Sequence, residues 1–99
     1  MTKKNNVYLT KSAQEDIEHV FDYIADDSIN NATYLITDLE EKICSLENFP
    51  KRNSLIPENE FFETDYRHLI YKNYRIIYRT VENSVYVLRI IHGAKLLKL

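Results

Sequence analysis

The stretch between residues 65 and 95 constrains the fold of this chain more than any other part of it. Two runs there, at residues 74–81 and 85–91, are rich in Ile, Val and Tyr, which favour a pleated and half-buried strand. A short polar segment between the runs suits a turn. A weaker run at residues 65–71 precedes them across Lys72 and Asn73, a pair that suits a tight hairpin. The stretch therefore predicts three consecutive antiparallel strands.

The register of these hairpins predicts which side chains share a face of the sheet. In a two-residue hairpin Tyr71 lies opposite Tyr74, and alternation along each strand assigns the other residues. One face is expected to hold His68, Ile70, Arg75, Ile77, Arg79, Tyr86, Leu88, Ile90 and His92. The opposite face is expected to hold Arg67, Leu69, Tyr71, Tyr74, Ile76, Tyr78, Val87, Arg89 and Ile91. Both faces are largely apolar, so the sheet needs two coverings, and a partner is a candidate for one of them.

The first part of the chain predicts a short strand followed by a helix. Residues 7–9 are apolar and are expected to form an edge strand that pairs with the three strands above. Residues 10–12 open a helix, and Ser12 and Glu15 have the spacing of a capping box. Apolar side chains then recur at helical spacing until about residue 27, at Ala13, Ile17, Val20, Phe21 and Ile24.

A second helix is expected to begin at a cap formed by Asn30 and Asn31 and to run to Phe49, before Pro50. Because only a few residues separate the helices, we expect an antiparallel hairpin that packs on the sheet. Residues 50–64 lack periodicity and predict a loop. The predicted fold is α+β, in the order β-αα-βββ, with a helical hairpin packed on a mainly antiparallel four-stranded sheet.

Size and composition indicate an ordinary globular domain. The 99 residues are 44% hydrophobic and 28% charged, which predicts a single domain over residues 1–99. No apolar run reaches the roughly 18 residues of a membrane span, and no hydrophobic segment follows the N-terminus. Cys44 is the only cysteine, which excludes an internal disulfide and fits a reducing compartment. We therefore expect a cytoplasmic protein without membrane contact.

Charge is distributed unevenly between the two halves of the chain. Residues 1–49 hold four basic and ten acidic groups, a net charge of −6, whereas residues 50–99 hold nine basic and five acidic groups, a net charge of +4. This asymmetry fits an anionic target for the basic half, or a partner that contacts both halves. It also fits two halves that simply solvate their own surfaces, and the sequence leaves these interpretations open.

Motifs for cofactor or metal chemistry are absent from the sequence. Gly93 is the only glycine, which excludes a glycine-rich loop around a phosphate. His19, His68 and His92 lack the spacing of metal ligands. We therefore expect neither a metal nor a cofactor.

Basic side chains on the predicted sheet are the candidates for a functional site. Arg75 and Arg79 are four residues apart, about 13 Å along a strand, and could hold successive phosphates. His92 is expected near Arg75 across the strand pair, with Lys95 just beyond. Arginine can stabilise charge on a phosphorane and histidine can move a proton near neutral pH, a minimal set for RNA cleavage. Arginines on strands also serve only for solubility or for pairing with helix carboxylates, and both interpretations stay open.

Several motifs resemble those of the RelE/ParE family of bacterial toxins. The matching positions in and near the two helices are Leu9, Ala13, Asp16, Ile17, Tyr23, Ile24, Ile43, Leu46 and Pro50, and the matching strand segments are 66–68, 74–79 and 87–92. The resemblance extends from about Tyr8 to Lys95, and the order of elements in the family agrees with the order predicted above.

This resemblance implies the toxin of a type II toxin–antitoxin pair. Such toxins are neutralised by a cognate antitoxin protein whose extended or helical C-terminal part wraps around the toxin. We expect the antitoxin to provide the second covering of the sheet, with apolar pockets as its contacts. The expected antitoxin-binding residues are Ile77, Tyr86, Leu88 and Ile90.

The resemblance leaves two activities open. RelE-like members cut mRNA on the ribosome, and here they imply Arg75, His92 and Lys95 as catalytic residues. ParE-like members, the plasmid stabilisation branch, inhibit DNA gyrase. For that activity the expected target-binding residues are Arg67, Arg75, Arg79 and Lys95.

Three features favour the ParE-like branch. The sequence pI of about 5.9 is low for a protein that enters an RNA-filled site, where phosphate contacts dominate affinity. Lys95 stands where many members have Arg, and no Tyr follows it. The predicted helical hairpin is also long. We therefore expect a gyrase inhibitor, with a ribosome-dependent mRNA endonuclease as the alternative. A third interpretation is a non-toxic module that only binds its antitoxin and helps to repress the operon.

Overall fold

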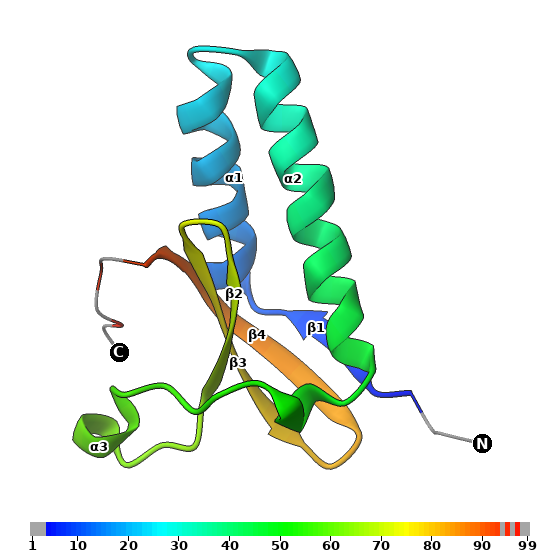
Figure 1. Ribbon diagram of the computed structural model, residues 1–99, viewed down its shortest axis with the longest axis vertical. Helices are drawn as coiled ribbons and strands as arrows, with labels where there is room; N and C mark the ends of the chain where they lie inside the picture. The colour runs from blue at the N-terminus through cyan, green and yellow to red at the C-terminus, as the bar shows by residue number, and fades with distance from the viewer. Residues whose placement is uncertain (1–3, 94, 96, 98–99) are drawn as a thin grey trace.

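The computed structural model describes residues 4–93, 95 and 97 of the chain. A hairpin of two long helices covers one face of a four-stranded sheet (Figure 1). The elements are β1 (Asn6–Leu9), α1 (Lys11–Ala25), α2 (Ile29–Cys44), η1 (Ser45–Glu47), η2 (Pro50–Arg52), α3 (Asn59–Phe62), β2 (Arg67–Tyr71), β3 (Tyr74–Val81) and β4 (Ser84–His92). The sheet order is β1-β4-β3-β2, with β1 parallel to β4 and the other pairs antiparallel. The predicted α+β class and β-αα-βββ order are confirmed.

The first long helix begins earlier than predicted. Thr10 is its N-terminal cap, because the Thr10 hydroxyl accepts a hydrogen bond from the backbone N–H of Ala13 at 3.1 Å. The same hydroxyl donates to the carbonyl of Leu88 at 3.0 Å, which anchors the start of α1 on β4. The predicted cap at Ser12 is therefore wrong, and the contact with β4 explains why Thr10 takes the role.

The second long helix also differs from its predicted limits. The Ser28 hydroxyl accepts from the backbone N–H of Asn31 at 3.2 Å, so the predicted cap at Asn30 and Asn31 is wrong and lies inside α2. The helix ends at Cys44 and a short 3₁₀ turn follows, whereas Phe49 has a left-handed backbone with φ of 50° that no helix can continue. Among the described residues, no helix is both long and apolar enough to cross a membrane.

The main hydrophobic core lies between the helical hairpin and the facing side of the sheet. Its buried members are Ala13, Leu39, Ile43, Leu46, Tyr71, Ile76, Tyr78, Val85, Val87 and Ile90. The Tyr78 ring is fully buried, and its hydroxyl donates to the carbonyl of Pro50 and accepts from the Asn53 amide at 3.0 Å. These two hydrogen bonds satisfy the polar end of a side chain that otherwise fills the core.

A β-bulge interrupts the pairing of β3 with β4. On β3 the consecutive residues Ile77 and Tyr78 pair with Arg89 and Val87 of β4, so Leu88 is an extra residue. An extra residue in one strand reverses the alternation of side chains beyond it. The faces predicted for residues 90–92 at the end of β4 are therefore reversed.

The bulge corrects three face assignments. Ile90 lies in the main core, and His92 pairs with Tyr74 on the helix side of the sheet, so the prediction that Ile90 and His92 share a face with Arg75 is wrong. Ile91 instead pairs with Arg75 and lies on the second face. The faces predicted for β2 and β3 are confirmed, because Tyr71 pairs with Tyr74 and the extra residue lies in β4.

Asp16 holds the bulge against α1. Its carboxylate accepts from Arg89 Nε at 2.7 Å and from Arg89 Nη2 at 3.0 Å, and it also accepts from the backbone N–H of Ile90 at 2.9 Å. The hydrogen bond that Arg89 donates to Asp16 raises the pKa of Arg89. This strand arginine therefore pairs with a helix carboxylate, as one interpretation of the sequence allowed.

Part of the second face is covered by the chain itself. Ile56 from the loop before α3 and Leu97 from the C-terminal residues pack on Ile77 and Ile91 of the sheet, with Tyr66 partly buried beside them. This small second core provides, at one end of the sheet, the covering that the sequence had suggested a partner would supply.

Two isoleucines on the second face test this arrangement. Ile77 is fully buried, whereas Ile70 on the neighbouring strand is 56% exposed. We expect Ile77→Ala to lower the free energy of unfolding by about 2–5 kcal/mol, because it removes buried methyl groups and leaves a cavity. Ile70→Ala should change it by about 0.5 kcal/mol or less. Urea unfolding followed by circular dichroism measures both, and equal losses would contradict the second core.

Candidate functional site

A hollow of about 550 Å³ opens where the β2–β3 turn meets the end of β4. Its lining includes Glu58, His68, Lys72, Arg75, His92 and Lys95, and we call this set the basic hollow. Arg75, His92 and Lys95 are the residues predicted as catalytic for an endonuclease. The structure thus gathers them around one hollow, even though the bulge places His92 on the other face of the sheet from Arg75.

Gly93 permits the close approach that forms the hollow. Its N–H donates to the carbonyl of Asn73 at 2.6 Å, and a Cβ at this position would lie 3.3 Å from the same oxygen. Because that spacing is tight for a carbon atom, a larger residue would require the Asn73 carbonyl to move by a few tenths of an ångström. The single glycine of the chain therefore allows this close approach of the end of β4 to the β2–β3 turn.

Glu58 reaches the hollow from the loop between η2 and β2. The loop is held along the edge of β2, where the N–H of His68 donates to the carbonyl of Ser54 at 3.1 Å. Asn59 closes the loop, because its side chain accepts from the N–H of Tyr66 at 3.0 Å and donates to the carbonyl of Tyr66 at 2.9 Å. These bonds fix the position of the neighbouring Glu58 carboxylate.

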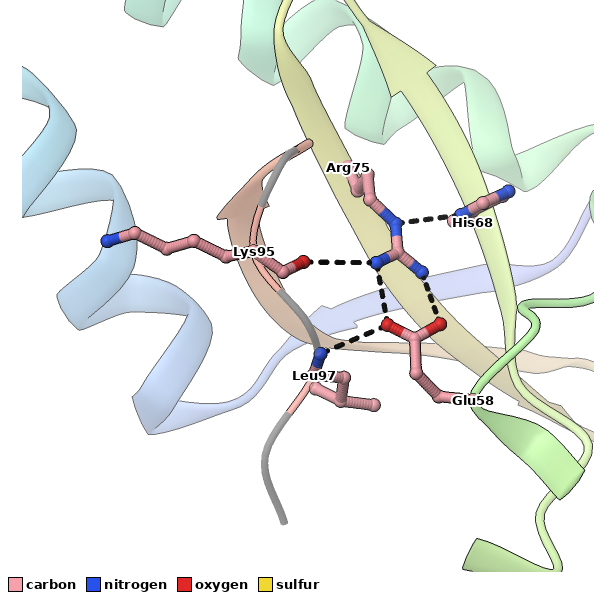
Figure 2. A network of polar contacts seen from close by, with 5 residues as sticks. All are labelled: Glu58, His68, Arg75, Lys95 and Leu97. Atoms are coloured by element: carbon pink, nitrogen blue, oxygen red, sulfur yellow. Dashed lines mark hydrogen bonds and ion pairs between the residues drawn. The ribbon is translucent and has the colours of Figure 1, made fainter. Parts of the chain in front are cut away.

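Arg75 and Glu58 form a buried, two-pronged ion pair in the hollow (Figure 2). Arg75 Nη1 lies 2.7 Å from Glu58 Oε2, and Nη2 lies 2.8 Å from Oε1. Arg75 Nε donates to Nδ1 of His68 at 3.0 Å, and Nη1 also donates to the carbonyl of Lys95 at 3.4 Å. The N–H of Leu97 donates to Glu58 Oε2 at 3.0 Å. The network joins a loop, two strands and two C-terminal residues.

This geometry occupies Arg75 almost completely. Four of its roughly five N–H donors have partners within the chain, and the side chain is 8% exposed. The carboxylate of Glu58, whose side chain is 4% exposed, neutralises its charge. A phosphate that approached Arg75 would therefore have to displace Glu58, at the cost of leaving a carboxylate buried without its partner.

The network also sets the protonation of its neighbours. The hydrogen bond from Arg75 lowers the pKa of Glu58 from an ordinary 4.5 to about 2, against the effect of burial. Burial, followed by the charge of Arg75, lowers the pKa of His68. Because Nδ1 of His68 accepts from Arg75, the neutral ring carries its proton on Nε2, the nitrogen that points away from the network in Figure 2. His68 thus offers a donor at that nitrogen.

Lys95 and His92 contribute differently from the prediction. Lys95 uses its backbone carbonyl in the network, while its exposed side chain extends away from the ion pair (Figure 2). The exposed His92 ring meets Tyr74 edge to face, with 5.9 Å between ring centres. Neither side chain is held against Arg75.

The predicted target-binding arginines are divided between the two faces. Arg79 is exposed on the second face, and its guanidinium lies 6.0 Å from the centre of the Tyr86 ring. Arg67 pairs with Tyr78 on the helix side, where its Nη1 donates to the carbonyl of Asn53 at 2.6 Å. The structure therefore does not bring Arg67, Arg79 and the basic hollow onto one surface.

The residues predicted to bind the antitoxin also differ in where they lie and in how exposed they are. Ile77 and Ile90 are buried in the second and the main core, at 0% and 3% exposure. Tyr86 and Leu88 are partly exposed, and the Tyr86 ring stacks on Tyr8 with 5.4 Å between ring centres. Antitoxin binding by these residues stays a prediction, with Tyr86 and Leu88 as the accessible pair.

Sequence reasoning missed Glu58 as a partner for Arg75. Glu58 lies in a segment without periodicity, 17 residues before Arg75, so no pattern connects the two. The available signal was indirect, because an arginine between apolar strand residues requires a carboxylate if it is buried. Among residues 4–93, 95 and 97, no group of three or more His, Cys, Asp or Glu side chains could hold a metal ion.

Comparisons with known proteins agree with this fold. The chain is similar to a structure described as the chromosomal ParDE toxin–antitoxin system from P. aeruginosa, with 17% identity, a TM-score of 0.72, and coverage of 92% of this chain and 98% of that one. It is also similar to the RelBE2 toxin–antitoxin complex from Mycobacterium tuberculosis, with 19% identity, a TM-score of 0.68, and coverage of 96% and 98%. No curated protein sequence matches the chain.

A hairpin of helices on this four-stranded sheet defines the fold class of the RelE and ParE toxins. The family described as "ParE toxin of type II toxin-antitoxin system, parDE" matches residues 7–97. The chain therefore belongs to the ParE toxin family of type II toxin–antitoxin systems, as the resemblance in its sequence had suggested.

Acid is expected to destabilise the protein in two stages. His68 has a lowered pKa in the folded state, so the stability it contributes is full above about pH 6.5 and falls below it. Glu58 contributes above about pH 4.5, and about 3 kcal/mol is lost as the pH falls toward its folded pKa of about 2. Urea unfolding at a series of pH values measures both stages. His68→Gln should remove the first and keep the second, and equal stability at pH 7 and pH 3 would contradict the network.

Proposed function

We propose that this chain is a toxin that inhibits DNA gyrase and is neutralised by a cognate antitoxin protein in the cytoplasm. Membership of the ParE toxin family supports a partner antitoxin. The similar structures are described as toxin–antitoxin systems, which supports the same partner. Gyrase is the target that the resemblance to the ParE-like branch implies.

The observation that carries the choice of gyrase is the pairing of Arg75. In a nuclease of this kind Arg75 would have to stabilise the charge of a phosphorane, and such a donor must be free to reach the substrate. Here Glu58 already occupies the guanidinium at 2.7 and 2.8 Å in a buried site. A neutral, internally satisfied pair favours a structural role for Arg75 and a toxin that acts by binding a protein.

One observation favours the alternative, a ribosome-dependent mRNA endonuclease. The basic hollow combines His68, His92 and Lys95 with an exposed Lys72, whose ammonium lies 5.6 Å from the centre of the Tyr71 ring. Such a set suits an anionic ligand. A His68 ring with its proton on Nε2 can donate to a phosphate oxygen but cannot accept a proton there, which makes it a weak general base.

Pulse labelling distinguishes the proposed targets. Within minutes of inducing the toxin alone, DNA synthesis is expected to stop while protein synthesis continues. An early stop in translation would contradict the proposal and favour the endonuclease. If neither DNA synthesis nor protein synthesis stops, the result would also contradict the proposal and favour a non-toxic module that only binds its antitoxin.

Purified components provide the second part of the same test. The protein should inhibit supercoiling by gyrase, and its antitoxin should reverse the inhibition. We expect Arg79→Ala to weaken inhibition about 5–30-fold, the effect of about 1–2 kcal/mol in a contact. Arg52→Ala, which removes another exposed arginine, is the matched control and should have no effect.

A further inference from the structure

The outer end of the α1–α2 hairpin extends beyond the sheet that covers its base (Figure 1). Helix residues near the base, such as Ala13, Leu39 and Ile43, are buried in the main core. Farther out on α1, Phe21 and Ile24 belong to the same apolar stripe but are only half-buried. The stripe therefore continues past the point where the sheet can cover it.

An apolar groove runs between the two helices on this part of the hairpin. A hollow of about 370 Å³ is lined by Ile17 and Phe21 of α1 and by Ile36 of α2, with Glu18 and Asp22 at its rim. Glu18 and Asp22 are exposed and lie four residues apart, so they follow one side of α1. We call this set the hairpin groove.

The charge around the hairpin groove has one sign. Residues 12–41 contain nine acidic side chains and no lysine or arginine. Asp16 is neutralised by Arg89 of β4 at 2.7 Å, whereas Glu18 and Asp22 are exposed. Soluble surfaces usually intersperse both signs, and a field of a single sign raises the local concentration of oppositely charged partners.

Large apolar side chains are exposed around the same end of the hairpin. Tyr23 is 82% exposed, Ile29 67% and Tyr34 75%. Aromatic residues are enriched at protein interfaces, where they bury a large area at a low cost in conformational entropy. The acidic rim and the apolar groove suit a protein segment that is both basic and apolar, and these exposed side chains add apolar surface elsewhere on the hairpin.

We propose that the hairpin groove docks a basic amphipathic segment of the toxin's target, DNA gyrase. This inference rests on the proposed function and adds a contact with gyrase on the helices to the contact expected of Arg79 on the sheet. Apolar residues of the segment would pack on Phe21 and Ile36, and its Lys or Arg side chains would face Glu18 and Asp22. An enzyme that holds DNA carries such basic surfaces because it must neutralise phosphates. The same acidic rim repels a nucleic acid ligand.

Charge reversal at the rim tests the inference. The double variant Glu18→Lys with Asp22→Lys changes two exposed side chains and raises the net charge from −2 to +2. The matched control is Glu60→Lys with Glu82→Lys, which makes the same change of charge at exposed positions in α3 and in the β3–β4 turn. Far-UV circular dichroism establishes that both variants are folded.

Binding to purified gyrase and inhibition of supercoiling are measured at about 0.1 M salt, where exposed charges are not fully screened. The rim variant is expected to lose at least tenfold in both, and the control to stay within about twofold of the original protein. The affinity of the original protein should also fall as salt is raised, and that dependence should be weaker in the rim variant.

The other outcomes overturn the inference in distinguishable ways. Equal losses in both double variants would show an effect of net charge alone. Full inhibition by the rim variant would place the gyrase contact elsewhere. Loss of antitoxin affinity with intact gyrase inhibition would assign the groove to the antitoxin. If the original protein itself fails to inhibit gyrase, the proposed function fails, and this inference fails with it.

Discussion

The buried ion pair between Glu58 and Arg75 is the interaction on which the second face of this protein depends. Burying a charge is costly unless it is paired and hydrogen-bonded, and here the carboxylate and the guanidinium satisfy each other twice. Lys95 and Leu97 bind to the same two side chains through their backbone groups. The pair therefore joins the loop before β2, the sheet and the described C-terminal residues into one structure.

This pairing changes what the basic half of the chain can do. On the sequence alone, Arg75, His92 and Lys95 are candidate catalytic residues, whereas the favoured ParE-like interpretation makes Arg75 and Lys95 part of a target-binding surface. In the structure Arg75 is neutralised, His92 lies on the other face, and Lys95 contributes a carbonyl. Among the described residues, accessible basic charge lies on the sheet and around the basic hollow, and a separate acidic groove lies on the helices.

Local sequence patterns predicted the architecture because each element carries its own signal. Alternation identified the strands, helical spacing identified both helices, and Lys72 with Asn73 fixed the register of one hairpin. Features that depend on contacts between residues far apart in the sequence were not predicted. Thr10 is the helix cap because it reaches Leu88, and Asp16 of α1 binds Arg89 and the N–H of Ile90, which follow the extra residue of β4. Glu58 has no periodic context at all, so its pairing with Arg75 required the fold.

A double-mutant cycle on Glu58 and Arg75, each replaced by Met, tests the central claim most directly. The free energy of unfolding is measured for the original protein, both single variants and the double variant. Each single change should cost about 3–5 kcal/mol, because it leaves a buried charge alone, and the double variant should cost much less than the sum. The predicted coupling is about 2 kcal/mol or more. A coupling below about 0.5 kcal/mol would mean that the two side chains do not depend on each other, and Arg75 would again be available for a substrate.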